Sequence, residues 1–129
     1  MEYTPEIINN KLIAEFMCYS KYDVQHGIKN SKPNIVDYFN IKEVPLNEDG
    51  MDWHSEYDLE FHSSWDWLIP SWVKFNNLGL KHFSCIEIRK EYIMYRNIIS
   101  QVIIKGDIES TFKLLSQAIE WYNKQSLNK

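Results

Sequence analysis

Five titratable side chains gather in one short stretch of this 129-residue chain: His54, Asp58, Glu60, His62 and Asp66. Side chains alternate between the two faces of a β-strand, so Asp58, Glu60 and His62 are expected to point the same way. Convergent carboxylate and imidazole groups can bind a metal ion or exchange protons. Their spacing matches no metal-ligand signature, however, and the solvent face of a half-buried strand has the same composition. We therefore expect no metal, no cofactor and no catalytic residue, and keep His62 and Asp66 only as candidate ligand-binding residues.

Two tryptophans form the second group of candidates. Trp67 lies about 160° from the centre of the apolar stripe that contains Trp65, at 100° per helical residue. Trp121 likewise lies away from the stripe of the last predicted helix. Strands or loops that cover both rings are the more common arrangement, because tryptophan is highly buried on average. The alternative is a docking surface made by Trp67, Trp121 and Trp53.

Motifs for nucleophilic catalysis and phosphate binding are absent from the sequence. It contains no Gly-x-Ser-x-Gly, and its four glycines are isolated from one another, so no glycine-rich phosphate loop can form. Cys18 and Cys85 are the only cysteines, and we expect both to be reduced.

Charge and hydropathy limit the class of protein and of partner. Hydrophobic residues make up 44% of the chain, which indicates a globular fold rather than disorder. The net charge of −4 argues against binding to nucleic acid, although Arg89 and Arg96 with exposed tyrosines are a weaker alternative. No run of eighteen apolar residues and no N-terminal leader pattern occur, so we expect a cytoplasmic protein that does not enter a membrane.

Helix and strand signals predict the elements that position these residues. Thr4 and Pro5 begin a helix over residues 5–17. Alternation predicts strands over 35–41, with Asp37 on the side of Phe39, and over 57–62. A capping box of Ser63 and Asp66 begins a second helix, which Gly79 ends.

The last third of the chain is ambiguous between helix and strand. Residues 83–89 and 92–97 are typical of two strands, although the spacing of Tyr92, Tyr95 and Ile99 also fits a helix. A final helix begins after Asp107 and carries the clearest apolar stripe. The sequence thus predicts one α+β domain over 1–129, a small antiparallel sheet with three helices packed mainly on one face, and a variable loop or strand insertion over 20–52.

Three blocks of the chain resemble a group of small bacterial and phage proteins of uncharacterised function. They read NKLIAEFM from Asn10, SSWDWLIP from Ser63, and AIEWYN from Ala118, and they cover the three predicted helices. The chain departs from the pattern at Ile69, where methionine is usual, and at Ser71-Trp72. The resemblance implies a compact α+β domain that is often associated with phages, and it carries no activity with it.

These observations together favour a non-catalytic binding protein. The expected partner is a host protein, and the expected role is that of a phage-derived accessory factor or of an inhibitor of a host component. The alternative is a small-ligand-binding protein or an enzyme that uses the neighbourhood of His62 and Asp66.

Overall fold

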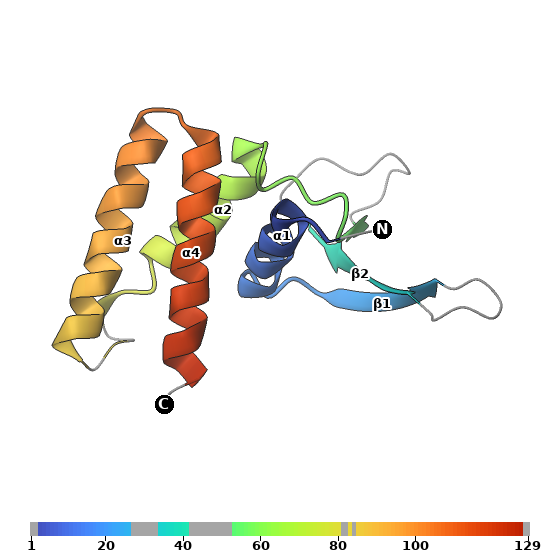
Figure 1. Ribbon diagram of the computed structural model, residues 1–129, viewed down its shortest axis with the longest axis horizontal. Coiled ribbons are helices and arrows are strands. Elements are labelled where there is room, and N and C mark those ends of the chain that lie inside the picture. The colour runs from blue at the N-terminus through green and yellow to red at the C-terminus, as the bar shows by residue number, and fades with distance from the viewer. Residues whose placement is uncertain (1–2, 27–33, 42–52, 81–82, 84, 128–129) are drawn as a thin grey trace. The chain divides into compact units, whose positions relative to one another are not determined.

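The computed structural model describes residues 3–26, 34–41, 53–80, 83 and 85–127 (Figure 1). The chain divides into two compact units, Met1–Leu59 and Glu60–Lys129. That these form one domain over 1–129 stays a prediction. The first unit contains one helix and a three-stranded antiparallel sheet, and the second contains three helices. The α+β class is therefore confirmed, with four helices in the described residues instead of three.

The first unit is a helix followed by a sheet in the order β1-β2-β3. Helix α1 (Pro5–Phe16) begins where predicted, because the Thr4 hydroxyl accepts a hydrogen bond from the Ile7 N–H. Strands β1 (Lys21–His26), β2 (Asn34–Asn40) and β3 (Trp53–Ser55) follow, and each pairs antiparallel with its neighbour. The predicted insertion over 20–52 thus contains β1 and β2, and its segments 27–33 and 42–52 lie outside the described residues.

The strand predicted over 57–62 is wrong, because this stretch forms turns. The Asp58 N–H donates to the Ser55 carbonyl, and the Ser63 N–H donates to the Glu60 carbonyl. Leu59 and Phe61 are nevertheless fully buried. The apolar alternation therefore identified two core residues, although the backbone there forms turns instead of a strand. The strand of this region is β3, which lies just before it.

The second unit consists of α2 (Trp65–Asn76), α3 (Ile86–Ile104) and α4 (Ile108–Leu127). Helices α3 and α4 run side by side as an antiparallel pair, joined by a tight turn in which Gly106 has a φ of +73° (Figure 1). The Asp107 carboxylate accepts a hydrogen bond from the Ser110 N–H, which confirms the predicted cap of the last helix. Within the described residues, none of the helices combines the length and the apolar character that a membrane span requires.

The strands predicted over 83–89 and 92–97 are wrong, because α3 occupies most of this stretch. Tyr92 and Ile99, which fit the helical spacing, are the two fully buried residues of α3. The Tyr92 hydroxyl donates to the carbonyls of Phe75 and Asn76 at the end of α2 and accepts from the Gly79 N–H. Packing against α2 therefore overrides the strand preference of the aromatic and β-branched residues in this segment.

The buried side of α2 also differs from the predicted one. Trp67, Leu68, Ser71 and Phe75 are buried, while Trp65 is only half-buried and Val73 is exposed. Apolar residues occur nearly all round this helix, so its hydrophobic pattern could not identify the core side. The predicted capping box is also wrong: Ser64 is the N-cap, and its side chain makes no capping hydrogen bond.

Candidate functional site

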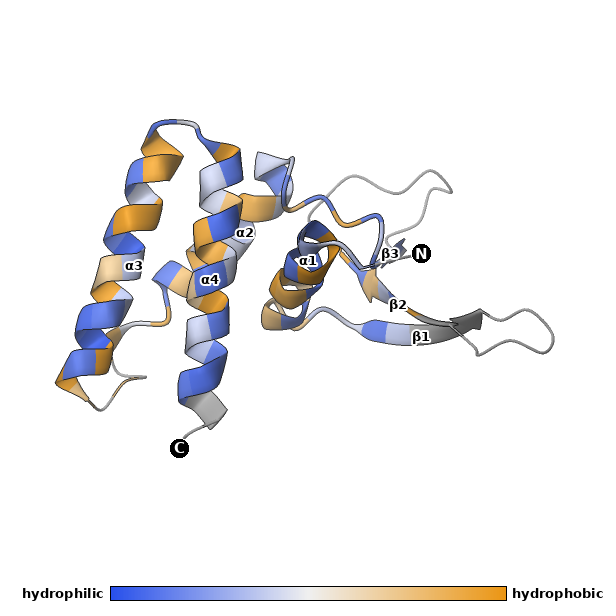
Figure 2. Ribbon diagram, in the orientation of Figure 1, coloured by the Kyte–Doolittle hydropathy of each residue, from blue (hydrophilic) through white to orange (hydrophobic). Residues whose placement is uncertain are grey.

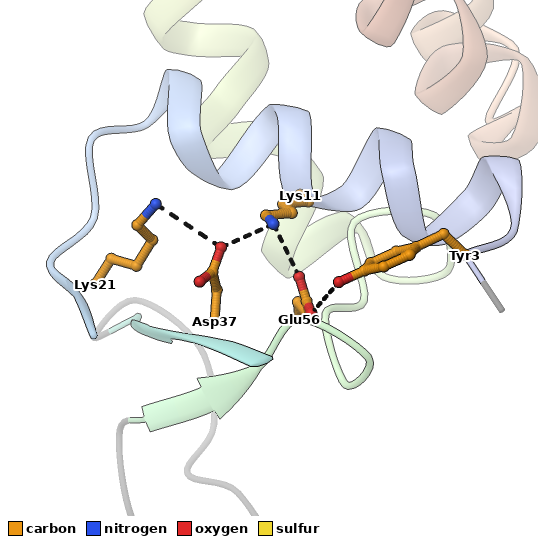
Figure 3. A network of polar contacts seen from close by, with 5 residues as sticks. All are labelled: Tyr3, Lys11, Lys21, Asp37 and Glu56. Carbon is orange, nitrogen blue, oxygen red and sulfur yellow. Dashed lines mark hydrogen bonds and ion pairs between the residues drawn. The ribbon is translucent and has the colours of Figure 1, made fainter. Parts of the chain in front are cut away.

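A network of charged side chains joins α1 to the inner face of the sheet. The Lys11 ammonium lies 2.8 Å from Asp37 Oδ2 and 3.0 Å from Glu56 Oε2 (Figure 3). Asp37 comes from β2 and Glu56 directly follows β3, so one lysine binds two segments of the sheet to the helix. Lys21 of β1 approaches Asp37 to 3.8 Å, and the Tyr3 hydroxyl donates to Glu56 Oε1 at 2.6 Å.

The network is deeply buried at its carboxylates and balanced in charge. The Glu56 side chain is 0% exposed, whereas 28% of the Lys11 side chain remains accessible. Two lysines face two carboxylates, so no net charge is left in the interior. This balance is required, because an unpaired buried charge costs several kcal/mol.

The pKa shifts of the network argue against proton transfer at neutral pH. Burial lowers the pKa of Lys11, but the contacts with Asp37 and Glu56 outweigh it and raise this pKa above its ordinary value. The hydrogen bond to Glu56 raises the pKa of the Tyr3 hydroxyl in the same way. Both groups therefore keep their protons near neutral pH, whereas a general acid or base needs a pKa close to the working pH. The network is suited to holding α1 on the sheet.

The opposite, outer face of the sheet carries aromatic rings. In the strand register Tyr22 lies opposite Tyr38, and Asn40, two residues further along β2, lies opposite Trp53. Because side chains alternate along a strand, Tyr22, Tyr38 and Trp53 share one face, and Asp37 and Phe39 point to the other. We call these three residues the aromatic face.

The three rings of the aromatic face contact one another. Tyr22 and Tyr38 are stacked, with centroids 5.1 Å apart and planes inclined by 6°, and the Trp53 ring meets Tyr22 edge-on at 4.7 Å. Tyr22 is 43% exposed, and the other two rings are half-buried. A partly accessible aromatic surface thus lies on this face of the sheet, and aromatic residues are enriched in protein interfaces.

The other two candidate tryptophans are engaged within the second unit. Trp67 is 3% exposed and meets the Phe61 ring edge-on at 5.3 Å, so the packing interpretation is confirmed and the docking interpretation is wrong for this ring. Trp121 is half-buried: its indole N–H donates to Glu91 Oε2 at 2.6 Å, and its ring lies 5.4 Å from those of Phe83 and Tyr95. Trp121 therefore joins α4 to α3.

The predicted titratable cluster is dispersed. His54 is buried on the inner face opposite Phe39, whereas Asp58 and Glu60 are exposed. The half-buried His62 ring lies 5.9 Å from Phe112, and Asp66 is exposed in the first turn of α2. No three His, Cys, Asp or Glu side chains among the described residues are placed to hold a metal ion.

Sequence reasoning missed the charged network, although one signal for it was present. Asp37 interrupts the apolar side of the strand predicted over 35–41, beside Phe39, and a carboxylate in such a position needs a cation. Lys11 and Glu56 carry no such signal, because their pairing depends on how the helix lies on the sheet.

Comparison with known proteins found no family model, no curated protein and no solved structure that matches the chain. The resemblance to small bacterial and phage proteins stays a prediction.

Proposed function

We propose that this chain is a non-catalytic protein-binding module that recognises its partner through the aromatic face of the sheet. The observation that carries the proposal is the accessible Tyr22 ring, stacked on Tyr38 and bordered by Trp53. Aromatic residues are enriched in the cores of protein interfaces, because they contribute large contact areas at low conformational cost.

The expected ligand is an extended segment of a partner protein that presents proline or other apolar side chains. Two rings that stack across neighbouring strands, with a third ring edge-on to one of them, form an aromatic surface, and extended proline-rich segments dock on aromatic-lined surfaces. The chain's net charge of −4 disfavours nucleic acid as the occupant, because phosphates need a basic surface. That the partner is a host protein, and that binding modifies or inhibits a host component, rests only on the resemblance to phage-associated proteins.

The alternative, a ligand-binding or catalytic site at His62 and Asp66, has less support. The half-buried His62 ring lies near Phe112, and the Asp66 carboxylate is exposed in the first turn of α2. No described feature favours a reaction at this pair over a structural role.

A displayed library of random linear peptides provides a defined probe for this proposal. We expect selection on the purified protein to enrich proline-containing or apolar peptides. Trp53→Ala and Tyr22→Ala should each weaken the best peptide by at least about tenfold, which is the loss typical of a central interface residue.

A matched control is Trp121→Phe, which removes the hydrogen bond to Glu91 in the other unit and should leave peptide affinity unchanged. Equal affinity of wild type, Trp53→Ala and Tyr22→Ala would place the binding surface elsewhere and refute the proposal.

A further inference from the structure

The outer side of α3 carries an unusual density of exposed apolar side chains. Ten large hydrophobic residues of the described chain are exposed, and α3 contributes five of them: Ile86, Ile93, Met94, Ile98 and Ile104. At 100° per residue these five lie on the side of the helix opposite the buried Tyr92 and Ile99. Apolar residues accordingly occur along the whole length of α3 (Figure 2).

The two ends of this surface match each other. Ile86 and Ile104 are the most exposed of the five, at 64% and 84%, and eighteen residues separate them. Eighteen residues are about five helical turns, so both side chains lie on the same line along the helix. Glu87 and Lys105 have the same separation and lie on a second line beside the first, both exposed and opposite in charge.

We propose that two copies of this chain pair through the outer sides of their α3 helices in antiparallel orientation. The two-fold axis lies perpendicular to both α3 helices. It places each line of residues against the same line of the second copy, which runs in the opposite direction. Ile86 then meets Ile104 of the second copy, and Glu87 meets Lys105 of the second copy. Both contacts occur twice.

The same two-fold axis also pairs residues in the middle of α3. Met94 meets Ile98 of the second copy, and Lys90 meets the polar Gln101 of the second copy. The midpoints of all four pairs fall at residues 95 to 96, so a single two-fold axis accounts for them. Ile86, Met94, Ile98 and Ile104 thus face apolar residues and Glu87 faces Lys105, whereas the exposed Ile93 meets the exposed Asn97 of the second copy.

Charge selects the antiparallel pairing over the parallel one. A parallel pair would place only the residues on the central line against their own copies, so that Lys90 would meet the same lysine of the second copy. It would also leave Glu87 about 27 Å away, along the helix, from Lys105 of the second copy. Like charges on facing helices are destabilising, and they choose helix orientation in coiled coils in the same way.

The first test is the mass of the purified protein across a wide concentration series, by sedimentation or light scattering. The wild type should approach twice the 15.5 kDa of one chain at high concentration. Ile104→Glu should stay a monomer, because it places a charge against Ile86 of the second copy. The matched control is Ile8→Glu, at an exposed isoleucine of α1, which should still form dimers.

The second test exchanges the charges at the two ends of the surface. Glu87→Lys and Lys105→Glu should each weaken the dimer by at least about tenfold, because each creates two like-charge pairs. The double variant restores two attractive pairs and should return the affinity to near the wild-type value. Glu15→Lys, at an exposed position of α1, is the control for the change in charge, and circular dichroism checks that each variant is folded.

Three results would overturn the proposal. They are a wild type that stays monomeric at every concentration, an Ile104→Glu variant that still dimerises, and a double variant that remains as weak as the two single ones. The last result would mean that Glu87 and Lys105 do not meet across the pair.

Discussion

The two faces of the small sheet use different chemistry on opposite sides of the same strands. The inner face buries the carboxylates of Asp37 and Glu56, which a helix lysine neutralises at 2.8 Å and 3.0 Å. The outer face carries three aromatic rings that contact one another and stay partly accessible. Neighbouring residues of β2 therefore have separate roles: Asp37 stabilises the unit, and Tyr38 belongs to the proposed binding surface.

Removal of the central cation should produce the largest effect on stability. Lys11→Met keeps much of the side-chain volume but leaves the buried Glu56 carboxylate without its lysine. We expect a loss of about 3 kcal/mol in the free energy of unfolding, the lower end of the range for a broken buried pair, because Lys11 is partly accessible. Urea denaturation measures this loss.

The matched control for this substitution is Lys124→Met in α4. Lys124 also pairs with a carboxylate, Glu120 at 3.5 Å, but both side chains are more than half exposed. Lys124→Met should lower the free energy of unfolding by at most about 0.5 kcal/mol. Similar losses in the two variants would show that the inner network contributes no more than a surface ion pair.

The pH dependence of stability should distinguish the inner network from the rest of the molecule. The pKa values of Lys11 and Tyr3 are raised in the folded chain, so the folded state holds these protons more tightly than the unfolded state. Their contribution is therefore complete below about pH 10 and is lost as the pH rises beyond it. Denaturation at several alkaline pH values should show that the free energy of unfolding declines less with rising pH in Lys11→Met than in Lys124→Met. Equal declines would contradict the role of Lys11.

Removal of the buried Tyr92 hydroxyl in the second unit should have an intermediate effect on stability. Tyr92→Phe removes a hydroxyl that donates to Phe75 and Asn76 and accepts from Gly79, in a fully buried position. We expect a loss of about 1–3 kcal/mol, because buried backbone groups lose their partner. Urea denaturation at neutral pH measures this loss. A free energy of unfolding equal to that of the wild type would mean that the hydroxyl does not stabilise the end of α2.

Substitution on the outer face of the sheet should have only a small effect on stability. Tyr22→Ala removes a cross-strand aromatic pair from a ring that is 43% exposed, and such pairs contribute less than about 1 kcal/mol. Thermal or urea denaturation should therefore give nearly the wild-type result. A loss as large as that of Lys11→Met would mean that this ring belongs to the core.

The sequence predicted the parts of the fold that local chemistry decides. Thr4 and Asp107 cap their helices as expected, because the acceptor lies within three residues of the N–H groups that it satisfies. The apolar stripe of α4 also marks its buried side, with Phe112, Leu115 and Ile119 in the core.

Features that depend on tertiary contacts could not be predicted in the same way. Trp67 is buried although it lies off the apolar stripe, because α2 is apolar nearly all round and its neighbours choose the buried side. Lys11 and Glu56 are 45 residues apart, and only the approach of α1 to the sheet brings them together. Trp53 was a candidate from the sequence. That Tyr22 and Tyr38 lie beside it on one face of the sheet follows only from the strand register.

The affinity of Trp53→Ala for a peptide selected on the wild-type protein, measured together with its unfolding, shows whether the outer face of the sheet binds a partner. We predict binding at least about tenfold weaker, with a free energy of unfolding within about 1 kcal/mol of the wild type. Unchanged binding, or a loss of binding that only follows a loss of folded protein, would contradict the division of the sheet into a stabilising face and a recognition face.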